Sequence, residues 1–291
     1  MIDMCPTNMK LRILTVFFVC AIANVGFTSE EVVDSNAVPE WITIKNLMFG
    51  DRSITSGNRS KITLSINKNI DDASTVPLVI SGGINQKSDE RFEKIYIIVD
   101  QNPIPTAAVF ELSPSQGPLY LETRLRIEKF SFIRALGETA DGNLHMATHW
   151  VEVQGGCSAP AGKNAGIDPH LGKMKFNLKK YRNMFKSVEG DRVFRVNLDE
   201  PNLVKVQVRH PNESALASDL DNPAEANYIR NIVVDYGGEM VLSAQVNFSI
   251  SDNPAFRFSL APKSEGELSF TVTDTHENQF TQKVNILGPS R

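Results

Sequence analysis

Short strand-like runs, separated by turn-forming residues, dominate the sequence and limit the folds that it can adopt. The run LYLETRLRI alternates along its whole length, so every second side chain from Leu119 to Ile127 faces one way. KITLSI, STVPLVIS, KIYIIVDQNP and TAAVFELSP precede this run, and FSFIRALGET and LHMATHWVEV follow it. Pro, Gly and Asn punctuate these runs, and no stretch among them keeps a helical period. The pattern predicts an all-β fold of the sandwich type over 38–153.

The same texture returns after an interruption. Residues 154–172, QGGCSAPAGKNAGIDPHLG, hold five glycines and two prolines and almost no large apolar side chain. Such a stretch buries too little surface to offset its ordering entropy, which predicts a flexible arm and linker over 154–198. Alternating runs such as LVKVQVRHP then resume. We therefore expect a second, smaller all-β domain over 199–291.

The N-terminus has the pattern of an export signal. Lys10 and Arg12 precede the apolar run ILTVFFVCAIA, and small residues follow. That run is too short to span a bilayer well, which favours a signal peptide over 1–28. The alternative is a buried N-terminal helix. With the signal removed, we expect no membrane span and a location outside the cytoplasm, which is the periplasm in a Gram-negative host.

Cys157 is the cysteine that draws attention. The chain has three cysteines, and Cys5 and Cys20 lie in the predicted signal. A lone thiol in an oxidising compartment cannot form an internal disulfide, which indicates a reactive thiol or a disulfide-linked dimer through Cys157. Gly155 and Gly156 add conformational freedom beside it, so we expect the sulfur to be accessible on a flexible arm. The alternative is an incidental free cysteine in a loop.

Other chemistries find little support in the sequence. A net charge of −4 argues against a nucleic-acid partner. His145 and His149 lie on a predicted strand, where four residues span roughly 13 Å, too far for two ligands of one metal ion. We therefore predict no metal, no cofactor and no catalytic residue. The basic run 173–186 either holds an anionic partner or is a solvated connector.

Longer stretches resemble a known pair of families. KIYIIVDQNPIPTAAVFELSP, LETRLRI and DGNLHMATHWVEVQGGCSAP resemble SoxY of bacterial thiosulfate oxidation. The part from Val204, through VKVQVRHPNES to ELSFTVTDTHENQFTQKVNI, resembles its partner SoxZ. Their order in one chain is similar to the fused SoxYZ-like carriers that are associated with quinoprotein dehydrogenases. The resemblance covers roughly residues 40–290.

The resemblance implies a carrier rather than an enzyme. It implies two immunoglobulin-like β-sandwich domains, with Cys157 holding a sulfur intermediate covalently and Gly155 and Gly156 forming its flexible arm. The implied partners are periplasmic sulfur-oxidation enzymes or a quinoprotein dehydrogenase. In the two-chain system the arm is a free C-terminus, whereas Cys157 is internal and reaches at most about 14 Å from Val153. A non-covalent accessory subunit, a structural secreted module and a thiol enzyme are the alternatives.

Overall fold

The computed structural model describes residues 34–67, 69–84, 88–158, 168–180, 193–217 and 225–289. Within this part of the chain, residues from Ser35 onward belong to one compact unit. The predicted signal peptide over 1–28 lies outside the described residues. So do 159–167 and 181–192 of the predicted arm and linker.

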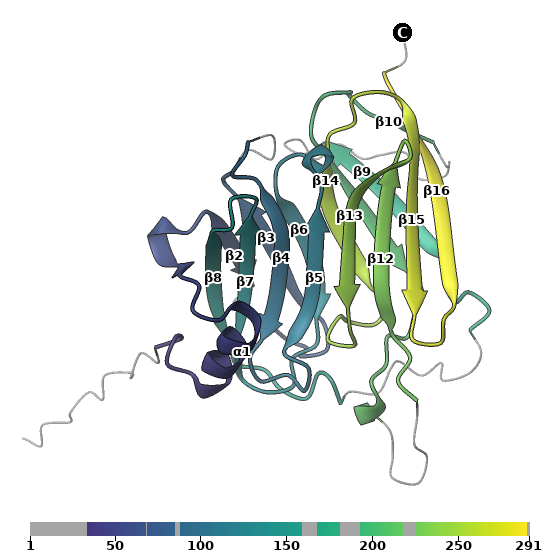
Figure 1. Ribbon diagram of the computed structural model, residues 1–291. Helices are drawn as coiled ribbons and strands as arrows, with labels where there is room; N and C mark the ends of the chain where they lie inside the picture. Colours follow the sequence, from purple (N-terminus) through teal and green to yellow (C-terminus); the bar gives the residue numbers. More distant parts are fainter. Residues whose placement is uncertain are drawn as a thin grey trace, which may run out of the picture. The chain divides into compact units, whose positions relative to one another are not determined.

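The larger of two β-sheets has ten strands and contains both halves of the chain (Figure 1). In order across the sheet, the strands are β1 (Ile54–Thr55), β8 (Leu144–Val151), β7 (Ser131–Thr139), β4 (Phe92–Val99), β5 (Thr106–Leu112), β13 (Glu239–Val246), β12 (Ile229–Tyr236), β15 (Gly266–Asp274), β16 (Gln279–Leu287) and β10 (Val193–Arg195). The pairs at its two edges, β1 with β8 and β10 with β16, are parallel, and its other pairs are antiparallel.

The smaller sheet has six strands that pair antiparallel throughout. In order across the sheet, they are β2 (Ile62–Ile66), β3 (Val76–Gly82), β6 (Tyr120–Leu125), β14 (Ala255–Leu260), β11 (Asn202–Val208) and β9 (Met174–Lys180). The short 3-10 helices are η1 (Gly57–Arg59), η2 (Pro114–Gln116) and η3 (Ala215–Ala217).

Direct strand pairing joins the N-terminal half to the C-terminal half in both sheets. Leu112 of β5 lies opposite Leu242 of β13, and Leu121 of β6 lies opposite Phe258 of β14. A single cluster of buried hydrophobic residues runs through both halves. The prediction of an all-β protein with two sheets is confirmed. The sequence did not predict that the halves would share those sheets as well as a covalent linker.

The core lies between the two sheets and follows the period-2 pattern of the strands. In β11, Val204, Val206 and Val208 are buried, whereas Lys205 and Gln207 face outward and stay partly exposed. This is the alternation expected of a strand with one face on a core.

Helix α1 (Pro39–Phe49) adds a smaller hydrophobic cluster on the larger sheet. Trp41 and Phe49 are buried there among residues of β4, β7 and β8. The Arg134 guanidinium lies 4.2 Å from the centroid of the Trp41 ring, and its Nη2 is 2.6 Å from Asp100 Oδ2. The pairing satisfies two charges that would be costly to bury alone.

Candidate functional site

The Gly-Gly-Cys segment continues from β8 and lies against the chain that follows β6. The Gly155 amide donates to the Glu128 carbonyl over 2.9 Å, and the Gly156 amide donates to the Ile127 carbonyl over 2.8 Å. A Cβ atom built on Gly156 would lie only 2.1 Å from the Ala73 carbonyl oxygen and 2.7 Å from the Ile127 nitrogen. Both neighbours are backbone atoms, so this contact requires glycine.

Gly155 differs from Gly156 in its surroundings. It is exposed, its φ is +82°, and a Cβ atom added to it would meet no other atom within 4 Å. The left-handed conformation explains the preference for glycine there. The structure therefore shows a packing role for Gly156 that the sequence did not reveal, while the flexibility of this arm stays a prediction.

The Cys157 side chain is 1% exposed, so the expectation of an accessible sulfur is wrong for this conformation. Its Sγ donates to the Arg126 carbonyl oxygen over 3.8 Å. Burial raises the pKa of the Cys157 thiol to about 12, and the negative charge of Glu128 adds to the rise, whereas Arg126 and Ser249 oppose it. A thiol with such a pKa is protonated at neutral pH and is a weak nucleophile.

The Glu128 carboxylate holds the backbone around Cys157. Its Oε2 accepts the Cys157 amide over 2.9 Å and the Ser158 amide over 3.1 Å. Its Oε1 accepts the Ser158 hydroxyl over 2.9 Å. Asn102 supports this arrangement, because its Oδ1 accepts the Glu128 amide over 2.9 Å. We call Glu128, with its three bonds to Cys157 and Ser158, the carboxylate clamp.

The C-terminal half also contacts the cysteine. The Ser214 hydroxyl donates to the Cys157 carbonyl over 2.8 Å, and Ser214 is itself buried. On the other side of the segment, the buried Arg126 donates from Nη1 to the Gly156 carbonyl over 3.3 Å. The cysteine therefore lies where the two halves of the chain meet, which sequence reasoning did not predict.

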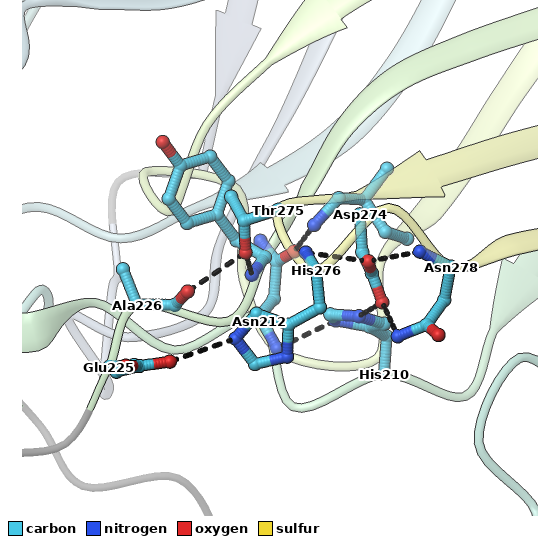
Figure 2. A network of polar contacts seen from close by, with 10 residues as sticks. His210, Asn212, Glu225, Ala226, Asp274, Thr275, His276 and Asn278 are labelled. Atoms are coloured by element: carbon cyan, nitrogen blue, oxygen red, sulfur yellow. Dashed lines mark hydrogen bonds and ion pairs between the residues drawn. The ribbon is translucent and has the colours of Figure 1, made fainter.

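A buried polar network shapes the turn that carries Ser214 (Figure 2). His210 Nδ1 accepts the Asn212 amide over 3.1 Å, and its Nε2 lies 3.5 Å from Asp274 Oδ2. The Asn212 side chain donates to the Ile250 carbonyl over 2.6 Å and accepts the Ile229 amide over 2.8 Å.

Asp274 anchors the other side of this network. Its Oδ1 accepts the backbone amides of His276 and Asn278, and its Oδ2 accepts the Asn278 side chain, each over 2.9 Å. Burial acts to raise the pKa of Asp274, but these hydrogen bonds outweigh it and lower the pKa overall. Asp274 therefore stays ionised beside His210 at neutral pH.

Two family models match the chain. Sulfur oxidation protein SoxY matches residues 45–157, and sulphur oxidation protein SoxZ matches residues 193–285. The chain carries a SoxY domain followed by a SoxZ domain. This arrangement fits a fused SoxYZ-like protein, and the matched SoxY range ends at Cys157.

Solved structures give a more distant likeness. The sulfur carrier protein SoxY from Chlorobium limicola f thiosulfatophilum is 20% identical, and the match covers 40% of this chain and 96% of that one with a TM-score of 0.33. The fibronectin(III)-like modules of Clostridium thermocellum CbhA are 11% identical, and that match covers 78% of this chain and 94% of theirs with a TM-score of 0.22. No curated protein matches the chain in sequence.

The two histidines weighed as metal ligands lie in β8 of the SoxY domain. His145 is buried, with its ring 6.1 Å from that of Phe92, and its Nδ1 accepts the Lys61 amide over 3.4 Å. Over the described residues, no group of three or more His, Cys, Asp or Glu side chains could hold a metal ion. In that same part of the chain, no helix is long and apolar enough to cross a membrane.

The SoxZ domain should lose stability as the pH falls from 7.5 to 5.5. Burial lowers the pKa of His210, and the nearby Asp274 opposes this only in part. The unfolded chain therefore takes up the proton first, so stability is full above about pH 6.5 and is lost below it, by up to about 1.4 kcal/mol per pH unit for one such group. Because the pKa of Asp274 lies below 3.8, that carboxylate does not titrate in this window.

Thermal unfolding followed at both pH values tests this expectation. His210→Asn keeps an acceptor for the Asn212 amide and should show a smaller fall in melting temperature than the wild type. His276→Asn, at a side chain that is 42% exposed, is the matched control and should fall as the wild type does. An unchanged pH response in His210→Asn would contradict the assignment.

Proposed function

We propose that this protein is an exported, periplasmic sulfur carrier that holds a sulfur-containing intermediate covalently on Cys157 and presents it to enzymes of sulfur oxidation. The observation that carries the proposal is the position of Cys157. The cysteine closes the SoxY match, and both the SoxY-domain Glu128 and the SoxZ-domain Ser214 bond to its backbone. A cysteine without a function needs no such pair of contacts.

The described conformation is a closed state of the carrier. Its thiol is buried and protonated, so exchange with a partner requires the Gly-Gly-Cys segment to leave its place. Four hydrogen bonds from or to side chains hold Cys157 and Ser158 through Glu128 and Ser214, and the two glycine amides add backbone bonds. These are polar contacts that water can replace once the segment moves out.

Once exposed, the thiol has a simple route to its cargo. The Cys157 proton leaves to solvent, and the thiolate attacks the outer sulfur of a disulfide-type or persulfide-type S–S bond on a donor protein. A new S–S bond forms on Cys157, and the donor leaves as a thiolate that carries the electron pair of the broken bond. This exchange needs no external oxidant.

A second candidate is a non-covalent accessory subunit of a quinoprotein dehydrogenase. The buried thiol, with its pKa raised to about 12, favours this candidate, because a subunit without cargo has no need of a reactive sulfur. The difference between the two candidates is chemical, and it can be measured directly on Cys157.

Intact mass spectrometry of the protein isolated from its native compartment separates the candidates. We expect an added mass that a reductant removes, and peptide mapping should place it on Cys157. Cys157→Ser should lack the adduct and keep its melting temperature, because serine fits the same space. A thiol that stays unmodified in the wild type under active sulfur oxidation would favour the accessory subunit.

A further inference from the structure

A basic groove lies where the end of β11 meets the start of β9 in the SoxZ-side part of the smaller sheet. Its volume is about 360 Å³, the size that drug-sized ligands occupy and more than one inorganic oxoanion needs. The groove is lined by His170, Lys173, Lys175, Gln207, Val208, Arg209 and Asn253. It belongs to the basic run that the sequence left open between a connector and a site for an anionic partner.

Strand pairing explains why these cations gather. Lys175 lies opposite Gln207, while their neighbours Met174 and Val208 face the core. The Arg209 amide donates to the Lys173 carbonyl over 2.8 Å, which brings Lys173 beside Arg209. Two exposed lysines and an exposed arginine therefore line one wall, in a chain whose net charge is −4.

One acid neutralises part of this charge. Asp168 Oδ2 accepts Arg209 Nε over 2.6 Å, and that hydrogen bond lowers the pKa of Asp168, so the acid stays ionised. Among the described residues, Lys173 and Lys175 make no ion pair with an acid. The two lysines thus present uncompensated positive charge to solvent.

The groove lies close to Cys157. Arg209 begins the segment that ends at Ser214, whose hydroxyl contacts the Cys157 carbonyl. These five residues span at most about 18 Å. Asn253, which also lines the groove, donates its amide to the His210 carbonyl over 2.8 Å within the same segment. A protein bound in the groove would therefore cover or adjoin the surface above the cysteine.

We propose that this groove docks an acidic surface segment of the partner protein that loads or unloads Cys157; the inference rests on the proposed carrier function. Exposed lysines on an otherwise acidic protein steer an oppositely charged partner and fix its orientation. The open groove and its fully solvated lysines fit carboxylates on a protein surface. A site for one small oxoanion would instead need buried, converging donors.

A fluorescein-labelled hexaglutamate peptide is the probe. In low salt it should bind the wild type, and binding should weaken as NaCl is added. Lys173→Glu/Lys175→Glu should weaken binding by about tenfold or more. Arg59→Glu/Lys263→Glu changes the net charge equally at two exposed positions outside the groove and should bind nearly as the wild type. Equal losses in both double variants, or none in either, would overturn the proposal.

Two further arms make the result specific. Sodium sulfate and NaCl at the same ionic strength should displace the probe equally, whereas saturable displacement by sulfate alone would show a small-oxoanion site and overturn docking of a protein. Cys157→Ser should bind the probe like the wild type. Failure of docking and failure of covalent carriage are therefore read from different measurements.

Discussion

Replacing Gly156 with alanine is expected to raise the rate at which Cys157 reacts with a disulfide reagent at pH 8 by about 100-fold or more. The new Cβ would lie 2.1 Å from the Ala73 carbonyl oxygen, and backbone on both sides leaves it no space. The segment must therefore leave its place, which ends the burial that holds the thiol pKa at about 12. A pKa near the ordinary value of about 8.5 multiplies the thiolate fraction at pH 8 by about 10³.

Gly155→Ala is the matched control for this experiment. A Cβ atom there meets nothing within 4 Å, so the substitution adds only the strain of a φ of +82°. Such strain costs about 1–2 kcal/mol, and the rate should rise far less than in Gly156→Ala. The melting temperature and near-UV circular dichroism must stay close to the wild type in both variants. A Gly156→Ala protein that folds and reacts as slowly as the wild type would show that the closed segment is not what protects the thiol.

The same glycine pair serves a seat and an arm at once. Gly156 allows the close approach that buries the cysteine, and Gly155 supplies a backbone conformation that other residues resist. A segment held by backbone and side-chain hydrogen bonds, with its sulfur the one large group buried, can exchange those bonds for water on opening. Burial in the described state is therefore compatible with a carrier that protects its thiol between partners.

Local pattern was sufficient to predict the strands but not their partners. The alternation in β6 and β11 follows from one buried face, so the sequence shows it directly. The pairing of β5 with β13 joins residues more than a hundred positions apart, and no local signal records which edge a strand will meet. This is why two separate domains were expected where continuous sheets formed.

The site was predicted by its residue and missed in its environment. Gly-Gly-Cys marked Cys157, but nothing near it in sequence pointed to Glu128 or Ser214, which lie 29 and 57 positions away. Glycine beside cysteine also has two physical meanings, freedom and close packing. Only the position of the Ala73 carbonyl distinguishes them, and that contact depends on tertiary structure.

Replacing Glu128 with alanine should open the carboxylate clamp and speed the same thiol reaction by about 30-fold to 150-fold. The variant loses two backbone bonds and one hydroxyl bond to a charged acceptor, and a net loss of about 2–3 kcal/mol in the closed state corresponds to that range. The rate of reaction with a disulfide reagent, measured from pH 7 to 10, gives both the opening equilibrium and the thiol pKa.

Glu128→Gln separates the two effects of this side chain. Its amide oxygen can still accept the Cys157 and Ser158 amides, so the segment should stay closed. The negative charge that helps raise the pKa of the Cys157 thiol is lost, so that pKa should fall without a large gain in opening. Ser158→Ala, which removes only the hydroxyl bond, should change the rate least. If Glu128→Ala reacts no faster than Glu128→Gln, the carboxylate does not hold the cysteine closed, and the latch must lie with Ser214 and the glycine amides.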